Sequence, residues 1–205
     1  MAKFVVTENN SHHLGTFQHG KNFLNEVKQV YQEDLSLYES SAFYIATFNK
    51  KIIGSVKITL WDGQASLPLE KLFNIKCRDL PFADKLIWQV GRLAISKTEN
   101  PLGINLLKQL LTLAIYSICQ HPDGVMVAEC DKKLLRVLNL FGIKTEILAP
   151  GIEYLGSETI PIYATDEWLK IFCKNSNYVE QISNIPSINR SLFKSILMEH
   201  NDLLC

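Results

Sequence analysis

The chain has 205 residues, which suits one domain, or one domain with a tail, and allows a sizeable hydrophobic core. Apolar residues make up 47% of it and charged residues 20%, an ordinary globular balance. The 21 Lys and Arg residues equal the 21 Asp and Glu residues, which argues against a nucleic-acid-binding protein. We find no export signal, and the apolar window of residues 102–119 is interrupted by polar side chains. We therefore expect a cytoplasmic protein without a transmembrane segment.

The cysteines show no CxxC motif and no spacing with histidine that is typical of a metal site. Their odd number and scattered positions favour free, mostly buried thiols in a reducing cytosol. The five are Cys77, Cys119, Cys130, Cys173 and Cys205. We expect no bound metal.

The first predicted elements are a helix over residues 23–37 and strands over residues 42–48 and 51–61. Polar and apolar residues alternate in the second strand, and Asn49-Lys50 makes a short polar turn before it. This pattern predicts an antiparallel hairpin. A short helix over residues 67–73 and a third strand over residues 86–96 follow.

The second half predicts a buried helix from Gly103 to about Gln120 and a buried strand over residues 125–129. Asp131 caps a helix that ends at Gly142, and the last strands span residues 144–148 and 159–164. The strand–helix–strand step over residues 86–129 requires a parallel pair with a right-handed crossover. We therefore predict an α/β fold with a mixed central sheet flanked by helices. Residues 1–168 form the domain, and residues 169–205 form a helical tail packed on or beside it.

Several motifs follow one another in a recognisable order. The first motifs are Gly54 to Leu60, Leu67-Pro68-Leu69-Glu70 and Phe73. They are followed by the predicted strand Trp88-Gln89-Val90-Gly91-Arg92-Leu93-Ala94-Ile95. The last motifs are Gly151 to Tyr154, Gly156 and Ile160-Pro161-Ile162. Over about residues 20–168 this order resembles the GNAT family of N-acyltransferases. The similar branch holds the acyl-homoserine-lactone synthases and the long-chain N-acyl amino acid synthases. The resemblance implies the GNAT fold and transfer of an acyl group from a thioester to an amine.

A second signature lies in the helix that Asp131 caps. General GNAT sequences have Asn, Tyr and Gly-Phe where this chain has Asp131, Leu138 and Gly142-Ile143. An ordinary capped helix explains this spacing nearly as well.

The resemblance also implies where the acyl donor binds, namely where the fourth and fifth strands of the fold separate. Backbone N–H groups near Leu93, Ala94 and Ile95 would polarise the thioester carbonyl. The phosphate end of the donor would meet the start of the next helix, near Gly103, Ile104 and Asn105. Residues 97–105 hold one glycine and a proline, a weak version of the phosphate loop of acetyl-CoA users. This departure favours an acyl carrier protein over coenzyme A, and both donors stay open.

The catalytic candidates depart from the branch. Gln89 stands at the place of its usual glutamate, and an amide cannot take a proton from an attacking amine. Glu129 and Asp131, at the end of the predicted strand, are alternative bases. An ordinary exposed carboxylate at the end of a strand explains Glu129 as well. Arg92 is a cation on an apolar strand and needs a partner. It either orients the site or forms an ion pair with Glu33 or Asp34 of the N-terminal helix.

The substrate-binding candidates are Glu33, Asp34 and Trp88. The two carboxylates lie where the lactone synthases keep acidic residues around the aminoacyl donor, and solvated helix-end charges explain them equally well. Trp88 lines an acyl pocket or belongs to the core. A local basic group suits either an acidic carrier protein or a solvated face, and consists of Lys132, Lys133, Arg136 and Lys144.

Together these observations predict an N-acyltransferase that moves an acyl group from acyl carrier protein or coenzyme A to a small-molecule amine, such as an amino acid or its derivative. Arg92, Gln89 and Glu129 are its catalytic candidates. Two alternatives stay open: an acetyl-CoA-dependent acetyltransferase, and a catalytically degenerate GNAT module that binds an acyl ligand or a partner protein. The absent glutamate and tyrosine favour the module. No oligomeric state is predicted.

Overall fold

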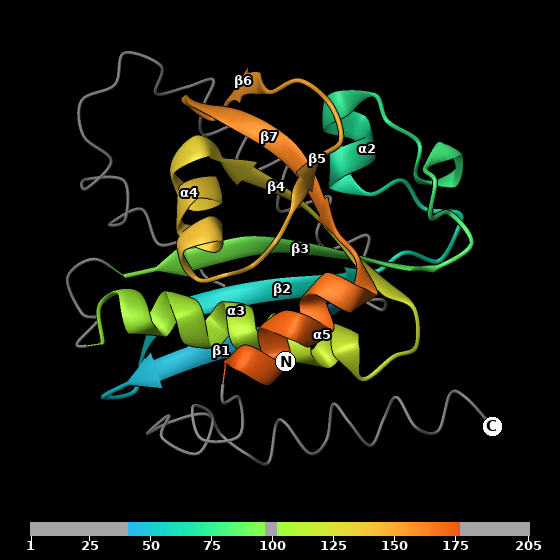
Figure 1. Ribbon diagram of the computed structural model, residues 1–205. Coiled ribbons are helices and arrows are strands. Elements are labelled where there is room, and N and C mark those ends of the chain that lie inside the picture. Colours follow the sequence, from blue (N-terminus) through green and yellow to red (C-terminus); the bar gives the residue numbers. More distant parts are fainter. Residues whose placement is uncertain (1–40, 97–101, 177–205) are drawn as a thin grey trace. The chain divides into compact units, whose positions relative to one another are not determined.

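A seven-stranded mixed sheet lies at the centre of residues 41–96 and 102–176, which a computed structural model describes (Figure 1). The strand order is β1-β2-β3-β4-β7-β5, and β6 also pairs with β7. β3 and β4 are parallel, and the other pairs are antiparallel. The predicted mixed α/β architecture is therefore confirmed. None of the helices in these two ranges is long and apolar enough to cross a lipid bilayer.

β1 (Ser41–Phe48) and β2 (Lys51–Leu60) form the predicted hairpin. The turn residues Asn49 and Lys50 both have positive φ angles, 49° and 64°, which is typical of the tight turn whose twist matches a hairpin. The predicted helix over residues 23–37 lies outside the described residues.

α2 (Pro68–Phe73) follows the hairpin, as predicted, and a 3₁₀ turn, η2 (Cys77–Asp79), comes after it. The Glu70 carboxylate accepts one hydrogen bond from the backbone N–H of Leu67 and another from that of Cys77, both at 2.8 Å. One charged side chain therefore joins the start of α2 to η2.

β3 (Leu86–Ile95), α3 (Ile104–Cys119) and β4 (Gly124–Asp131) form the predicted strand–helix–strand unit. The two strands lie side by side in parallel, and α3 connects them. Eight residues of α3 are buried, which explains why this segment is so apolar without being a membrane span.

α4 (Lys132–Leu140) begins where Asp131 predicted it, because the Asp131 carboxylate accepts a hydrogen bond from the Leu134 N–H at 2.7 Å. Gly142 follows the helix with a φ of 81°. The chain then forms β5 (Glu146–Ile147), β6 (Ile152–Tyr154) and β7 (Ser157–Ala164). β5 is shorter than the predicted strand over residues 144–148.

α5 (Asp166–Asn175) crosses the predicted boundary between domain and tail at residues 168 and 169. Its Leu169 and Phe172 are buried in the same core cluster as α3. The beginning of the predicted tail therefore packs with the sheet, and residues 177–205 lie outside the described residues.

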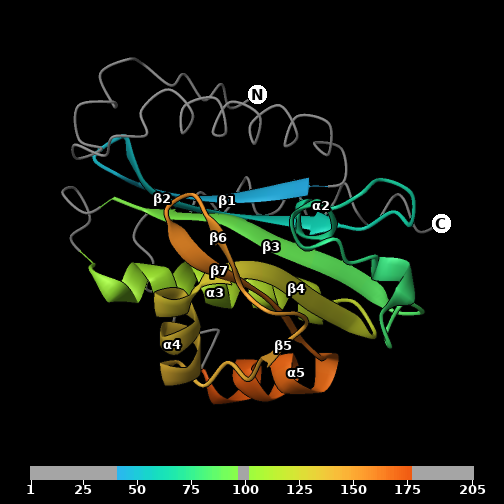
Figure 2. The same ribbon diagram turned by 90° about the horizontal axis from the view of Figure 1, so that it is seen from above.

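The sheet separates two apolar clusters of buried side chains. The larger lies between the sheet and α3, α4 and α5, and the smaller lies under α2 and η2 and includes Ile87, Val125 and Val127. Figure 2 shows α3, α4 and α5 on one face of the sheet and α2 on the other. We call these the α3 face and the α2 face.

Candidate functional site

The parallel strands β3 and β4 separate towards their C-terminal ends. Their ladder runs from the pair Leu86 and Gly124 to the pair Val90 and Ala128. Within the described residues the pairing stops there, although β3 continues to Ile95 and β4 to Asp131. Figure 1 shows the two strands diverging beyond this point. The backbone of residues 91–95 therefore has an edge that β4 does not pair.

A β-bulge lies in β3 where this separation begins. In the ladder with β2, Lys57 is opposite Gly91 and Ser55 is opposite Ala94, so β3 has one residue more than β2 between these pairs. Arg92 lies in the bulge with a φ of 52°, a backbone conformation that non-glycine residues rarely adopt. The Ser55 hydroxyl donates to the Arg92 carbonyl at 3.3 Å. The bulge changes the direction of the β3 backbone where the donor site was predicted.

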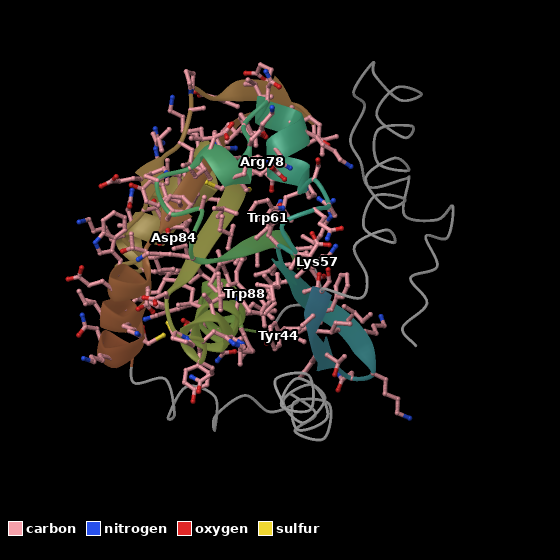
Figure 3. The ribbon with its side chains drawn as sticks, turned by 90° about the vertical axis from the view of Figure 1, so that its right-hand side faces the viewer. Tyr44, Lys57, Trp61, Arg78, Asp84 and Trp88 are labelled. Atoms are coloured by element: carbon pink, nitrogen blue, oxygen red, sulfur yellow. The ribbon has the colours of Figure 1, made fainter. Side chains whose placement is uncertain are left out.

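Polar side chains gather on the α2 face beside the bulge. In the ladder between β2 and β3, Thr59 lies opposite Gln89, and Lys57 lies opposite Gly91. Lys57, Thr59 and Gln89 are only 4%, 3% and 5% exposed. Burying polar groups this deeply is costly unless they have partners or a function. Figure 3 shows Lys57 on this side of the sheet, and Trp88 with Tyr44 on the other side beside α3.

The side chains of Gln89 and Glu129 are in contact where β3 and β4 begin to separate. Gln89 pairs in register with Val127, so Glu129, two residues further along β4, is on the same face. The Gln89 Nε2 donates to Glu129 Oε1 at 2.8 Å. Gln89 Oε1 is buried and has no hydrogen-bond partner among the described residues. The structure therefore brings together two of the predicted catalytic residues, which are 40 positions apart in the sequence.

Gly91 leaves free space beside this pair. A Cβ atom added at Gly91 would meet no described heavy atom within 4 Å. Gly91 is two residues beyond Gln89 on β3, on the same face, and it is the first β3 residue beyond the ladder with β4. The described residues thus leave room for a Cβ atom beside the polar pair.

Cys130 follows Glu129 on β4 but points into the core on the α3 face, where it is 3% exposed. Burial, together with the nearby carboxylates of Asp131 and Glu129, raises the pKa of the Cys130 thiol to about 12. Cys130 is therefore a thiol near neutral pH and is not a nucleophile of this site.

The residues predicted to bind the acyl donor lie along β3 and at the start of α3. Leu93 and Ile95 are half-buried, and Ala94 is exposed. Gly103 precedes α3 with a φ of 56°, and Ile104 is 59% exposed. The Asn105 N–H donates to the Leu102 carbonyl at 3.1 Å. This N–H group, which was predicted to face the phosphate end of the acyl donor, therefore already has a hydrogen-bond partner.

Trp88 does not join the polar group. It is 3% exposed, lies in the core cluster with α3, and has its ring 5.0 Å from that of His121. Neighbouring residues of a strand point to opposite faces, which explains why Trp88 and Gln89 separate. Leu138, at the position where the sequence resemblance implies a tyrosine, is also buried in the core. Glu33 and Asp34 lie outside the described residues.

The predicted basic group has mixed surroundings. Lys132 forms an ion pair with Glu158 at 3.1 Å, and the Lys144 ammonium lies 4.1 Å from the centre of the Trp168 ring. Lys133 and Arg136 are exposed on α4. Two of the four cations therefore have partners within the chain.

Lys57, Thr59 and Gly91 were not among the predicted site residues. The alternation of polar and apolar residues in β2, read together with Gln89 in β3, could have indicated a polar strip on one face of the sheet. The open space at Gly91 has no such signal, because it depends on what packs beside it.

These features define the fold class. A mixed sheet whose single parallel pair separates beside a bulge, within the described residues, is the GNAT acyltransferase fold. No family model and no curated protein matches the sequence.

Two solved structures share this fold. One is FeeM, an N-acyl amino acid synthase from uncultured soil microbes, with a TM-score of 0.52, 14% identity, and coverage of 70% of this chain and 93% of that chain. The other is BjaI, a CoA-dependent acyl-homoserine lactone synthase with MTA, with a TM-score of 0.51, 15% identity, and coverage of 73% and 67%. At these identities the likeness establishes the fold.

Proposed function

We propose that this chain is an N-acyltransferase that moves an acyl group from an acyl thioester to a small-molecule amine, such as an amino acid or its derivative. The observation that carries this proposal is the hydrogen bond between the buried Gln89 and the half-buried Glu129 at the point where β3 and β4 separate. A buried amide and a carboxylate beside open space suit a polar substrate better than a purely structural role. The two similar structures are synthases that make N-acylated products by their names.

The acyl thioester would lie along the unpaired edge of β3. Backbone N–H groups near Leu93, Ala94 and Ile95 would stabilise the negative charge that develops on the carbonyl oxygen during attack. The positive φ at Arg92 supports this role, because a bulge turns backbone groups out of the regular ladder. The phosphate end of the donor would approach the first turn of α3, near Gly103 and Ile104.

Arg92 would orient the site. The bulge fixes its backbone, and its guanidinium stays charged at every physiological pH. It would hold a carboxylate or carbonyl of the bound substrate, or the groups that position that substrate.

The leaving thiolate would depart without a protein acid at position 138. Leu138 cannot donate a proton and is buried in the core. A thiol is a stronger acid than an alcohol or an amine, so its anion leaves with little help. The missing tyrosine therefore does not exclude catalysis.

The donor is either an acyl carrier protein or coenzyme A. One of the two similar structures is CoA-dependent by its name, whereas residues 97–105 hold little of a Gly-rich phosphate loop. Purified chain supplied with the same acyl group on each carrier would distinguish the two by initial rate.

The first test compares organic extracts of cells that express the wild-type chain, Arg92→Ala, or Arg78→Ala. Arg78 is an exposed residue of η2 and serves as the matched control for losing an arginine. We expect an N-acylated amine with the wild type and with Arg78→Ala, and a large loss with Arg92→Ala. Mass spectrometry identifies both the acyl chain and the amine.

Full product formation by a folded Arg92→Ala variant would remove Arg92 from the mechanism. Extracts that all match those of cells without the chain would favour the other candidate, a degenerate GNAT module that binds an acyl ligand. The amide at position 89 is the observation that favours this second candidate. Binding of an acyl thioester without turnover would then be the positive result.

A further inference from the structure

The orientation of the Gln89 amide follows from its partner. A carboxylate oxygen accepts hydrogen bonds and donates none when ionised, so the NH₂ end of the amide faces Glu129. The opposite orientation would set Gln89 Oε1 against Glu129 Oε1 at 2.8 Å, oxygen to oxygen. Glu129 thus turns the carbonyl end of Gln89 away from itself.

That carbonyl end is an unsatisfied acceptor. Gln89 is 5% exposed, and its Oε1 has no hydrogen-bond partner among the described residues. A buried acceptor without a partner destabilises the folded chain, and a bound N–H donor would remove that cost. The Glu129 carboxylate next to it supplies a negative charge and two acceptor oxygens. Both groups therefore suit a ligand that donates hydrogen bonds and carries a positive charge.

The described residues leave room beside this pair at Gly91. Gly91 contributes no side chain, and no described heavy atom lies within 4 Å of its added Cβ. Lys57 is a buried charged residue on the same face, and its ammonium lies 5.5 Å from the centre of the Phe43 ring. Phe43 is on β1, on the opposite side of β2 from β3 and β4.

We infer that Gln89 Oε1 and Glu129 form a binding site for a primary ammonium group, and that Glu129 on β4 takes the proton that an amide at position 89 cannot take. The proton step rests on the proposed acyl transfer, whereas the binding site does not. Gln89 is a positioning residue for Glu129 and a direct ligand of the nitrogen.

The ammonium gives one proton to Glu129 and becomes a nucleophile, and its nitrogen lone pair forms the C–N bond with the thioester carbonyl. The C–S bond breaks, and its electron pair leaves on the sulfur as a thiolate. The nitrogen loses a second proton as the amide forms, and the two released protons go to the thiolate and, through Glu129, to water. The products are an N-acyl amine, a free thiol and one proton from the original ammonium.

The binding site can be tested without any acyl transfer. The full chain is titrated with n-butylamine, which is an ammonium ion at neutral pH, and with n-butanol as the uncharged control, while NMR follows the Gln89 side-chain amide. We expect the amine, and not the alcohol, to shift the Gln89 signals of the wild type. The response should disappear in Glu129→Gln. Equal responses to both compounds, or no response at Gln89, would overturn the ammonium site.

The proton step is tested by exchanging the two groups. Glu129→Gln should lower kcat/KM for the amine by about 10²–10⁴-fold, the usual contribution of a general base. The double variant Gln89→Glu, Glu129→Gln puts the carboxylate on β3 and the amide on β4, keeps the hydrogen bond, and should recover most of the loss. Gln89→Glu alone should bring no gain, and its pH profile should acquire a further ionisation, because two adjacent carboxylates share a proton.

The outcomes separate this inference from the proposed function. Activity that rises in Gln89→Glu and is unchanged in Glu129→Gln would show that the base belongs on β3, and would overturn the assignment of Glu129 while acyl transfer stands. An amine-specific shift at Gln89 in a chain that transfers no acyl group from any thioester would retain the ammonium site and reject the enzyme. Thermal unfolding of each variant confirms that a loss is not a loss of folding.

Discussion

Gly91 is the residue that leaves space beside Gln89 and Glu129 in the proposed site. It lies opposite Lys57 in the ladder with β2 and is the first residue of β3 beyond the ladder with β4. Its backbone does not need glycine, since its φ is not among the positive values that strain other residues. The lack of a side chain at this position therefore matters for space rather than for conformation.

Gly91→Ala should separate function from stability. The added methyl group meets no described atom, so we expect the free energy of unfolding to stay the same or rise by up to about 1 kcal/mol, because alanine restricts the unfolded chain. The methyl group should meanwhile weaken binding of n-butylamine and raise KM for the amine. Chemical denaturation and the amine titration measure the two effects. Unchanged amine binding in Gly91→Ala, and also in Gly91→Val, would show that the space is unused.

The candidate site could be predicted from the sequence only one residue at a time. Gln89 and Glu129 were both candidates, but their contact depends on the parallel register that pairs Gln89 with Val127. No local pattern sets that register for two residues that are 40 positions apart in the sequence. Trp88 was a substrate-binding candidate because of its type, and strand alternation puts it on the other face, in the core.

Among the secondary-structure elements, those with local signals were predicted well. The polar pair Asn49-Lys50 sets the hairpin turn, and the Asp131 carboxylate caps α4. The bulge at Arg92 could not be predicted, because it is an extra residue relative to β2 and exists only in the pairing of the two strands. The same reason explains the short β5, whose length is set by its pairing with β7.

Two free thiols, one on α3 and one on α5, lie close together. The sulfur atoms of Cys119 and Cys173 lie 3.8 Å apart, and both residues are half-buried. Their hydrogen bond lowers the pKa of Cys173 and raises that of Cys119, since one thiol stabilises the thiolate of the other. Cys77 and Cys130 differ, because burial raises the pKa of each to about 12.

Mild oxidation should therefore join these two helices. In a Cys205→Ser background at neutral pH, 4,4′-dithiodipyridine should react with the Cys173 thiolate to form a mixed disulfide, which Cys119 then attacks to release a second thiopyridone. We expect peptide mapping to find the Cys119–Cys173 disulfide and to leave Cys77 and Cys130 unmodified. Cys173→Ser is the control and should form no crosslink. A disulfide that involves Cys77 or Cys130 instead would contradict this packing of α3 and α5.

At the scale of the whole described chain, one sheet contains both the stable core and the site. The α3 face has the larger apolar cluster, whereas the α2 face has a smaller cluster followed by the buried polar residues. The change from apolar to polar on the α2 face occurs between Ile87 and Gln89 on β3 and between Val127 and Glu129 on β4. The polar groups thus begin where the parallel ladder ends, so the same part of the fold opens the sheet and carries the candidate site.

The central claim, transfer of an acyl group from a thioester to an amine, is tested most directly with the purified full chain. Decanoyl thioesters of coenzyme A and of an acyl carrier protein are each incubated with a mixture of L-amino acids, and mass spectrometry follows N-decanoyl products over time. With at least one of the two donors, we predict an N-acyl amino acid that accumulates in proportion to the concentration of the chain. If no amino acid is acylated, amines derived from amino acids are offered next, and we predict their N-acyl products. In Glu129→Gln the product should be strongly reduced. A folded chain that leaves both thioesters intact with every amine offered would contradict the acyltransferase and favour a binding module.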